Sequence, residues 1–279
     1  MSQIEQSIKR KIESVGTPLK DWDINIYRGV LTGCNEAFII SGEKREEILR
    51  NCTTIEEKQR TAELIRPILR GRDIKRYGYD WAGLWLINTH NGVRGQYPPI
   101  DINEYPSIKR HLDQYWDKIC ARDDKGITPY NLRNCAYLDD FFKPKIVYME
   151  IQTDNPDEGY PFPCYSYDKN NCITLNTAYI MSSDTIDVRY ILGVLNSKLG
   201  KFLVKLYVTQ LQARQFRMLA QYVQKFPIVY ASNTEAQTMI ELVQKAIDSN
   251  CSKTANLIDE LAYNLYGLSK DEIAFIENR

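Results

Sequence analysis

Residues 188–225 read VRYILGVLNSKLGKFLVKLYVTQLQARQFRMLAQYVQK and combine a helical apolar pattern with positive charge. Apolar side chains recur about one helical turn apart from Ile191 to Leu206, which predicts one long helix over 188–207. The stretch holds seven Lys or Arg residues and no Asp or Glu, although the whole chain has 36 basic and 36 acidic side chains. A polyanion would therefore meet a local positive field that the net charge conceals. Charge alone still favours the plainer interpretation, a helix with Lys and Arg on its solvated face.

Short strands are predicted upstream of this stretch, and helices at both ends of the chain. The predicted strands are 24–30, its hairpin partner 37–40 across a turn at Gly33, 83–88, 145–151, 164–167 and 177–181, with a loop at 155–163. The predicted helices are 2–15, 43–50, 54–65, 106–120 and 234–278. These elements indicate an α+β fold with an irregular mixed or antiparallel β core, flanking helices and a helical C-terminal tail. We expect three regions, which are an N-terminal amphipathic helix and linker (1–20), a central domain (21–230) and the tail packed on it (231–279).

The composition is that of an ordinary globular protein, with 43% hydrophobic and 26% charged residues. No apolar run approaches the ~18 to 20 residues that span a bilayer, and the N-terminus lacks the apolar centre of a signal peptide. The seven cysteines are scattered without a CxxC pair, and only two histidines are present. We therefore expect no metal site, reduced thiols and a cytoplasmic location.

Motifs for catalysis are missing from the sequence. It contains no glycine-rich phosphate loop and no nucleophile elbow, and its two histidines are isolated. Asp123, Asp124 and Lys125 superficially resemble nuclease residues, but they lack the separated carboxylates that hold catalytic Mg²⁺. A nuclease, or another enzyme whose active site is unreadable in the sequence, is kept as a minor alternative.

Two polar and basic segments fit binding better than catalysis. Residues 60–79, RTAELIRPILRGRDIKRYGY, hold six Lys or Arg residues against Glu63 and Asp73, and Gly71 permits a close approach of the backbone to a partner. Residues 209–217, TQLQARQFR, offer amide and guanidinium groups that can address base edges as well as phosphates.

Six segments, in order, resemble the signatures of one family. They are 28–38 (RGVLTGCNEAF), 67–74 (PILRGRDI), 143–146 with 176–179 (KPKI and NTAY), 192–199 (LGVLNSKL), 226–228 (FPI) and 258–269 (IDELAYNLYGLS). This set resembles the TaqI-like C-terminal specificity domain, the target-recognition domain of Eco57I-type restriction-modification adenine DNA methyltransferases. The resemblance implies sequence-specific recognition of double-stranded DNA, which the module clamps for adenine methylation by a separate catalytic domain.

The same resemblance implies what the chain binds. S-adenosylmethionine would belong to the catalytic domain, so no cofactor and no catalytic residue is expected in this chain, which would not be an enzyme by itself. The expected partners are double-stranded DNA and a methyltransferase domain or subunit, with no membrane. The alternative is a protein-interaction module or specificity subunit that docks a methyltransferase without direct base readout.

Residue type and location predict the DNA contacts of such a module. Phosphate contacts are predicted for Arg70, Arg72, Lys75, Arg76, Lys201 and Lys205. Base or near-base contacts are predicted for Gln210, Gln212, Arg214, Gln215 and Arg217. Thr32 and Asn35 are expected to orient DNA from the turn at Gly33, and Arg28 completes the predicted set.

Overall fold

The structure is a computed structural model that describes residues 1–155, 161–212, 214–249 and 251–278, so residues 156–160 of the loop predicted at 155–163 lie outside it. The helices are α1 (Gln3–Val15), α2 (Asn35–Phe38), α3 (Gly42–Arg50), α4 (Ile55–Leu64), α5 (Pro106–Asp113), α6 (Trp116–Ala121), α7 (Val188–Asn196), α8 (Lys198–Tyr207), α9 (Ala220–Val223), α10 (Asn233–Asp248), α11 (Ser252–Leu265) and α12 (Lys270–Glu277). The strands are β1 (Thr17–Pro18), β2 (Asn25–Arg28), β3 (Ile39–Ser41), β4 (Ile65–Leu69), β5 (Leu84–Ile87), β6 (Lys145–Met149), β7 (Ile151–Thr153), β8 (Tyr165–Asp168), β9 (Ile173–Thr174), β10 (Ala178–Ser182), β11 (Gln210–Gln212), β12 (Gln215–Arg217) and β13 (Pro227–Ile228). Among the helices of the described ranges, none has the length and apolar character of a membrane span.

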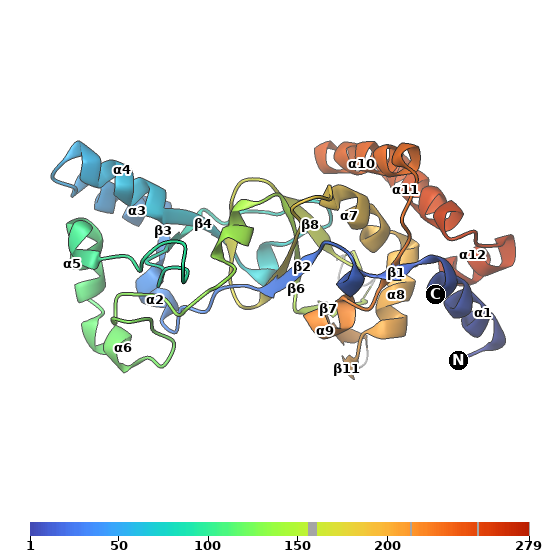
Figure 1. The fold of residues 1–279 in the computed structure, drawn as a ribbon, viewed down its shortest axis with the longest axis horizontal. Coiled ribbons are helices and arrows are strands. Elements are labelled where there is room, and N and C mark those ends of the chain that lie inside the picture. The colour runs from blue at the N-terminus through green and yellow to red at the C-terminus, as the bar shows by residue number, and fades with distance from the viewer. Residues whose placement is uncertain (156–160, 213, 250, 279) are drawn as a thin grey trace.

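The molecule is elongated (Figure 1). Helices α2 to α6 gather at one end, α1 and α7 to α12 gather at the other, and the short strands lie between them. The α+β class and the mixed β core predicted from the sequence are confirmed. The two chain ends lie side by side, where α1 packs on α12 and Lys11 forms an ion pair with Glu272 at 2.6 Å.

The central sheet has the order β2-β10-β6-β8 and is antiparallel throughout. Successive side chains of a strand point to opposite faces, so the sheet can supply two cores at once. In β6, Ile146 and Tyr148 enter the core on the α7 to α12 side, while Val147 enters the core on the α2 to α6 side. Because both faces are buried, the strand is apolar almost without interruption instead of alternating with polar residues.

Three smaller sheets surround the central one. Their orders are β3-β5-β4-β9, in which only β4 and β9 are parallel, β11-β12-β7, and β1-β13. The hairpin predicted between 24–30 and 37–40 is wrong, because β2 pairs with β10 and β3 pairs with β5. Local polar bonds explain the difference, since Thr32 Oγ1 binds Asn35 Oδ1 at 2.5 Å and accepts from the Cys34 amide at 3.2 Å. Such bonds compete with strand pairing, and helix α2 follows directly.

The single helix predicted over 188–207 is also wrong, because α7 and α8 are separate helices. Ser197 divides them, since its Oγ donates to the Val194 carbonyl at 2.6 Å and accepts from the Gly200 amide at 3.1 Å. It therefore closes one helix and caps the next. Gly200 permits this turn, because a Cβ there would lie 2.1 Å from the Leu195 carbonyl oxygen. The helix predicted at 106–120 is likewise two helices, α5 and α6.

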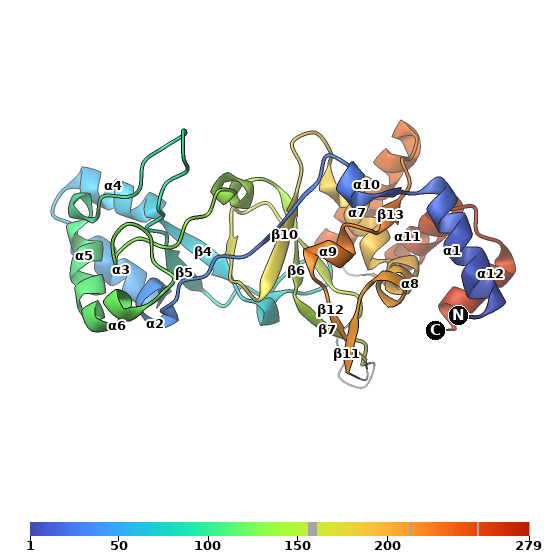
Figure 2. The same cartoon turned by 60° about the horizontal axis from the view of Figure 1, so that its bottom comes forward.

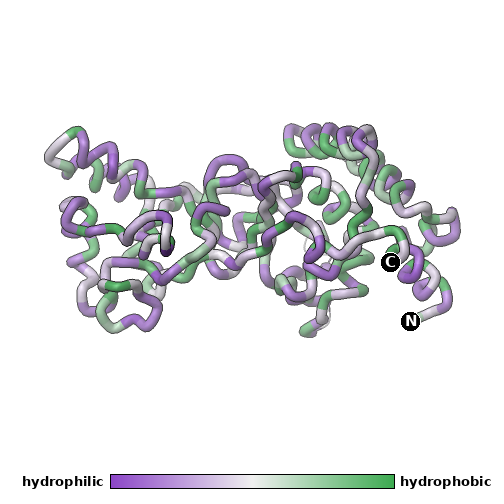
Figure 3. Tube along the Cα trace, viewed as in Figure 1, coloured by the Kyte–Doolittle hydropathy of each residue, from purple (hydrophilic) through white to green (hydrophobic). Residues whose placement is uncertain are grey.

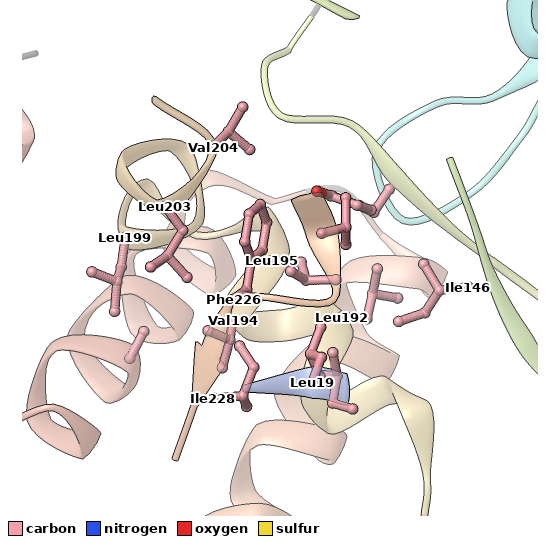
Figure 4. Packing of buried hydrophobic residues seen from close by; sticks show 14 of the residues in the cluster. Leu19, Ile146, Leu192, Val194, Leu195, Leu199, Leu203, Val204, Phe226 and Ile228 are labelled. Carbon is pink, nitrogen blue, oxygen red and sulfur yellow. The ribbon is translucent and has the colours of Figure 1, made fainter. Parts of the chain in front are cut away.

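The break turns both helices onto one core. In Figure 4, Leu195 of α7, Leu199 and Leu203 of α8, and Phe226 beside β13 point into the same packed interior. Helix α10 packs along α7, and hydrophilic and hydrophobic stretches alternate along it (Figure 3), as expected for a helix with one buried stripe. The helices predicted at 2–15 and across the C-terminal tail are confirmed, while the region boundaries at 20 and 230 stay a prediction.

Candidate nucleic-acid interface

Glu150 lies between β6 and β7 and binds two arginines that are distant in sequence. Its Oε2 accepts from Arg28 Nη2 at 2.8 Å, and its Oε1 accepts from Arg217 Nε at 3.0 Å. Arg28 Nε also donates to the Asn176 carbonyl at 2.8 Å. Glu150 is only 8% exposed, whereas the side chains of Arg28 and Arg217 are 50% and 46% exposed. One buried carboxylate thus holds two half-exposed guanidinium groups side by side.

The 3-10 turn η2 (Gly71–Asp73) lies beside this cluster. Arg70 pairs with Asp73 through several hydrogen bonds, the shortest at 2.6 Å, and these bonds raise the pKa of Arg70. The Gly71 amide donates to Thr177 Oγ1 at 3.2 Å, which joins the turn to β10. Arg72 points outward and, within the described residues, has no hydrogen-bond or ion-pair partner. Within the part of the chain that the structure describes, the turn thus presents one guanidinium group without a partner and one that is bound.

A depression of about 640 Å³ separates η2 from Glu150. It is lined by the charged side chains of Arg70, Arg72 and Glu150 together with the apolar side chains of Met149 and Ile151. The side chain of Ile151 is 48% exposed although it lies in a strand. A lining that combines apolar side chains with cationic groups suits a flat, partly apolar ligand with acceptor atoms at its edge.

Asp154, just after β7, forms a second carboxylate site with two lysines. Lys205 Nζ lies 2.8 Å and Lys201 Nζ 3.1 Å from its oxygens. Burial raises the pKa of Asp154, but the hydrogen bonds from Lys205 and Lys201 outweigh burial and hold it below its usual value. The Asp154 amide also donates to the Arg214 carbonyl at 2.8 Å, which ties this site to the tip of the neighbouring hairpin.

The hairpin of β11 and β12 projects from the body of the molecule beside β7 (Figure 2). It carries exposed Gln210, Gln212 and Arg214 and half-buried Gln215; Ala213 lies outside the described residues. Arg214 has φ +66°, a left-handed backbone that a hairpin turn requires. Its base is fixed, because β12 pairs with β7 from Gln215 to Arg217.

These elements together form one contiguous basic surface. It comprises Arg28, Arg70, Arg72, Lys201, Lys205, Arg214 and Arg217, joined through Asp73, Glu150 and Asp154. Among the described residues, seven cations face three carboxylates, so this part of the surface is positive although the chain is neutral overall. A positive surface with a projecting two-stranded ribbon matches the charge and shape of duplex DNA.

Comparison with known proteins identifies the family. The TaqI-like C-terminal specificity domain matches residues 66–228, which is more than half of the chain. The chain belongs to this family.

The similar curated proteins are type II methyltransferases. M.PaeR7I of Pseudomonas aeruginosa is 23% identical over 277 residues, which cover 97% of this chain and 43% of that protein. M.BstVI of Geobacillus stearothermophilus is 23% identical over 287 residues, which cover 99% of this chain and 45% of that protein. The chain therefore spans less than half the length of these relatives.

Two solved restriction enzymes share the fold of this specificity domain. The type IIL restriction-modification enzyme MmeI, solved in complex with DNA, has a TM-score of 0.64 at 14% identity, covering 94% of this chain and 36% of that one. The type IIG restriction endonuclease BpuSI has a TM-score of 0.53 at 12% identity, covering 95% and 34%. At this level of identity the likeness concerns the fold alone.

Four residues predicted for DNA binding do not join the basic surface of the specificity domain. Thr32 is buried, and its carbonyl accepts from Arg122, while exposed Asn35 bonds to Thr32 at the start of α2. Arg76 turns inward and donates to the Asn196 carbonyl at the end of α7. Lys75 lies 3.9 Å from Asp80. Their proposed DNA contacts stay predictions without a shared surface to support them.

Some of the segments that identify the specificity domain are architectural. Lys145 of the segment 143–146 is fully buried, forms an ion pair with buried Asp168 and donates to the Phe141 carbonyl at 2.6 Å. Asn196 of the segment 192–199 uses its amide to bond the amide and carbonyl of Tyr165 in β8, at 3.0 and 2.9 Å. These motifs fix how the helices meet the central sheet.

Two carboxylates, Glu150 and Asp154, hold the cations of the basic surface in place, and neither is predicted from the sequence. Glu150 and Asp154 are acidic, so a search for positive charge passes over them. A usable signal existed for Glu150, because it is a lone carboxylate in the apolar run 145–151 and a buried charge requires a partner.

The acidic residues that raised the nuclease alternative show no metal cluster. Asp124 forms an ion pair with Arg133 at 3.2 Å, and Asp123 is exposed. Across the ranges that the structure covers, no three His, Cys, Asp or Glu side chains group as a metal site.

Proposed function

We propose that this chain recognises a sequence of double-stranded DNA within a restriction-modification methyltransferase. The single observation that carries the proposal is the convergence of seven cations and a projecting hairpin on one surface. The family match and the type II methyltransferase relatives support it. In the proposed assembly a separate catalytic domain binds S-adenosylmethionine and methylates an adenine, while this chain holds the duplex.

The surface offers two kinds of contact with DNA. Arg72, Lys201 and Lys205 have long side chains that suit phosphate oxygens, which carry charge but no sequence information. The β11–β12 ribbon fits the major groove of B-DNA, which admits a two-stranded ribbon and exposes a distinct pattern for each base pair. Gln210, Gln212 and Gln215 would there meet base edges.

Salt dependence tests the proposed contact with DNA. If the surface neutralises about five phosphates, the logarithm of the binding constant should fall with the logarithm of salt concentration at a slope of about −4 to −5. Fluorescence anisotropy with a labelled duplex measures this slope, on the chain together with its methyltransferase where that is a separate subunit. Arg72→Ala should make the slope shallower by about one unit.

Arg10→Ala is the matched control, because Arg10 is an exposed arginine on α1 outside the basic surface. An equal effect of both variants, or binding that ignores salt, would count against DNA contact at this surface. Absence of DNA binding while a methyltransferase is still bound would instead favour the alternative, a docking module without base readout.

A further inference from the structure

Each arginine held by Glu150 keeps one amino group free. Arg28 uses Nε and Nη2, and Arg217 uses Nε and Nη2, while Nη1 of neither residue meets an acceptor among the described residues. Both residues lie at the ends of strands, with Arg28 opposite Tyr179 and Arg217 opposite Ile151. Two polar contacts on a side chain that a strand carries fix the direction in which the remaining Nη1 group points.

The presence of the Glu150 carboxylate favours base readout over phosphate binding by Arg28 and Arg217. A phosphate contact gains from charge and tolerates a mobile side chain, so a buried carboxylate that cancels half of the charge of two arginines would weaken it. Base readout instead requires donors in a fixed direction, because an acceptor pair on a base edge is recognised by geometry. Asp154 with its two lysines shows the other arrangement, since an ammonium group has no planar fork to direct.

The depression between η2 and Glu150 also favours a base as the ligand. Its apolar lining includes exposed Ile151 and half-buried Met149, which suit a base or a thymine methyl group and offer nothing to a phosphate. The Glu150 carbonyl accepts from the Met218 amide at 2.6 Å, so the backbone that carries the carboxylate is itself anchored to the segment after β12.

We propose that Glu150 is a positioning residue that aims Arg28 and Arg217 at the acceptor edge of a guanine in the recognised sequence. The inference rests on the proposed function and deepens it, because it assigns base choice to a triad outside the hairpin. Each carboxylate oxygen of Glu150 accepts from one of the two arginines, so the role that we assign to Glu150 is to orient them.

The test compares two affinities of the protein. One is for a duplex that carries its recognised sequence, found by selection from random DNA, and the other is for a duplex of unrelated sequence. Glu150→Gln keeps the size of the side chain and removes its charge. We expect the ratio of the first affinity to the second to fall about 10-fold or more, while affinity for unrelated DNA is kept or rises. Asp154→Asn is the matched control, because it also releases two cations on the same surface, and it should raise affinity for all sequences alike.

Two outcomes would overturn the inference. One is a Glu150→Gln variant whose affinities for both duplexes change by the same factor, which would place the arginines on phosphate. The other is a parallel loss of affinity for both duplexes and of thermal stability, which would make Glu150 a structural residue only. If Glu150→Gln fails to fold, Arg28→Lys and Arg217→Lys give the same readout, because they keep the charge but lose the fork.

The wild-type protein separates this inference from the proposed function. A wild-type protein with no sequence preference removes both proposals. The wild-type protein could instead show a sequence preference that Glu150→Gln and the two lysine variants fully retain. That result would remove only the assignment of base choice to Glu150, Arg28 and Arg217.

Discussion

Arg214 combines a left-handed backbone conformation with a long, charged side chain. Its φ of +66° favours glycine, yet the residue is an exposed arginine at the tip of the hairpin. We therefore predict a role for the Arg214 side chain in binding, because glycine would fit this backbone better.

Replacement of Arg214 by glycine isolates the side chain. Arg214→Gly should fold at least as well as the wild-type protein, because glycine adopts this backbone without strain. If Arg214 contacts a base, discrimination at one position should fall by about 1–3 kcal/mol. Affinities for single-substituted duplexes measure this, with Arg214→Lys as the variant that keeps the charge. An equal loss of affinity for every sequence would instead assign Arg214 to phosphate.

At this scale the sequence predicts the cations but not their partners. Arg28, Arg72 and Arg217 are found from residue type, yet Glu150 lies 122 residues from Arg28 and 67 from Arg217. Pairing across such distances depends on β2, β7 and β12 meeting in space, which local patterns do not encode. For the same reason the inward turn of Arg76 toward Asn196 is invisible in a basic run.

At the scale of elements, the sequence predicts which helices and strands exist better than it predicts where they begin and end. Apolar periodicity, which burial imposes directly, predicts the strands at 145–151 and 177–181, near the observed β6 and β10, and the helices at both ends. The division of α7 from α8 depends on Ser197 and on close packing at Gly200, which apolar spacing does not record. The same holds for α2, where side-chain bonds override a strand pattern.

The buried pair of Lys145 and Asp168 locks β6 to β8. Asp168 also accepts from the Cys172 amide at 3.0 Å, the Asn170 amide at 2.9 Å and the Tyr79 hydroxyl at 2.8 Å. Its removal therefore leaves a buried cation and three further donors without their acceptor. We expect Asp168→Ala to lower the free energy of unfolding by about 3–5 kcal/mol, measured by urea denaturation.

Lys143→Ala is the control for this prediction. Lys143 pairs with Asp140 and Asp184 two residues before the buried lysine, but its side chain is 30% exposed. Its loss should cost less than about 1 kcal/mol. Equal costs for the two variants would show that the buried pair has no special role in joining the strands.

At the scale of the whole molecule, one sheet is shared by two hydrophobic cores. The α2 to α6 end and the α7 to α12 end pack on its opposite faces, and the basic surface forms where β2, β7 and β12 meet. The fold class followed from the order of strands and helices, and the family followed from short motifs that the structure shows to be partly architectural. The location of the surface needed the tertiary fold, because its residues come from four separate stretches of the chain.

Selection from random DNA tests the central claim most directly. Duplexes with a randomised central stretch are bound to the protein, with its methyltransferase where that is a separate chain, and the retained pool is sequenced. We predict that one short sequence is enriched, with fixed bases at several positions. Retention of DNA in which every position stays random, or no retention of duplex DNA at low salt, would contradict the claim that this chain recognises a DNA sequence.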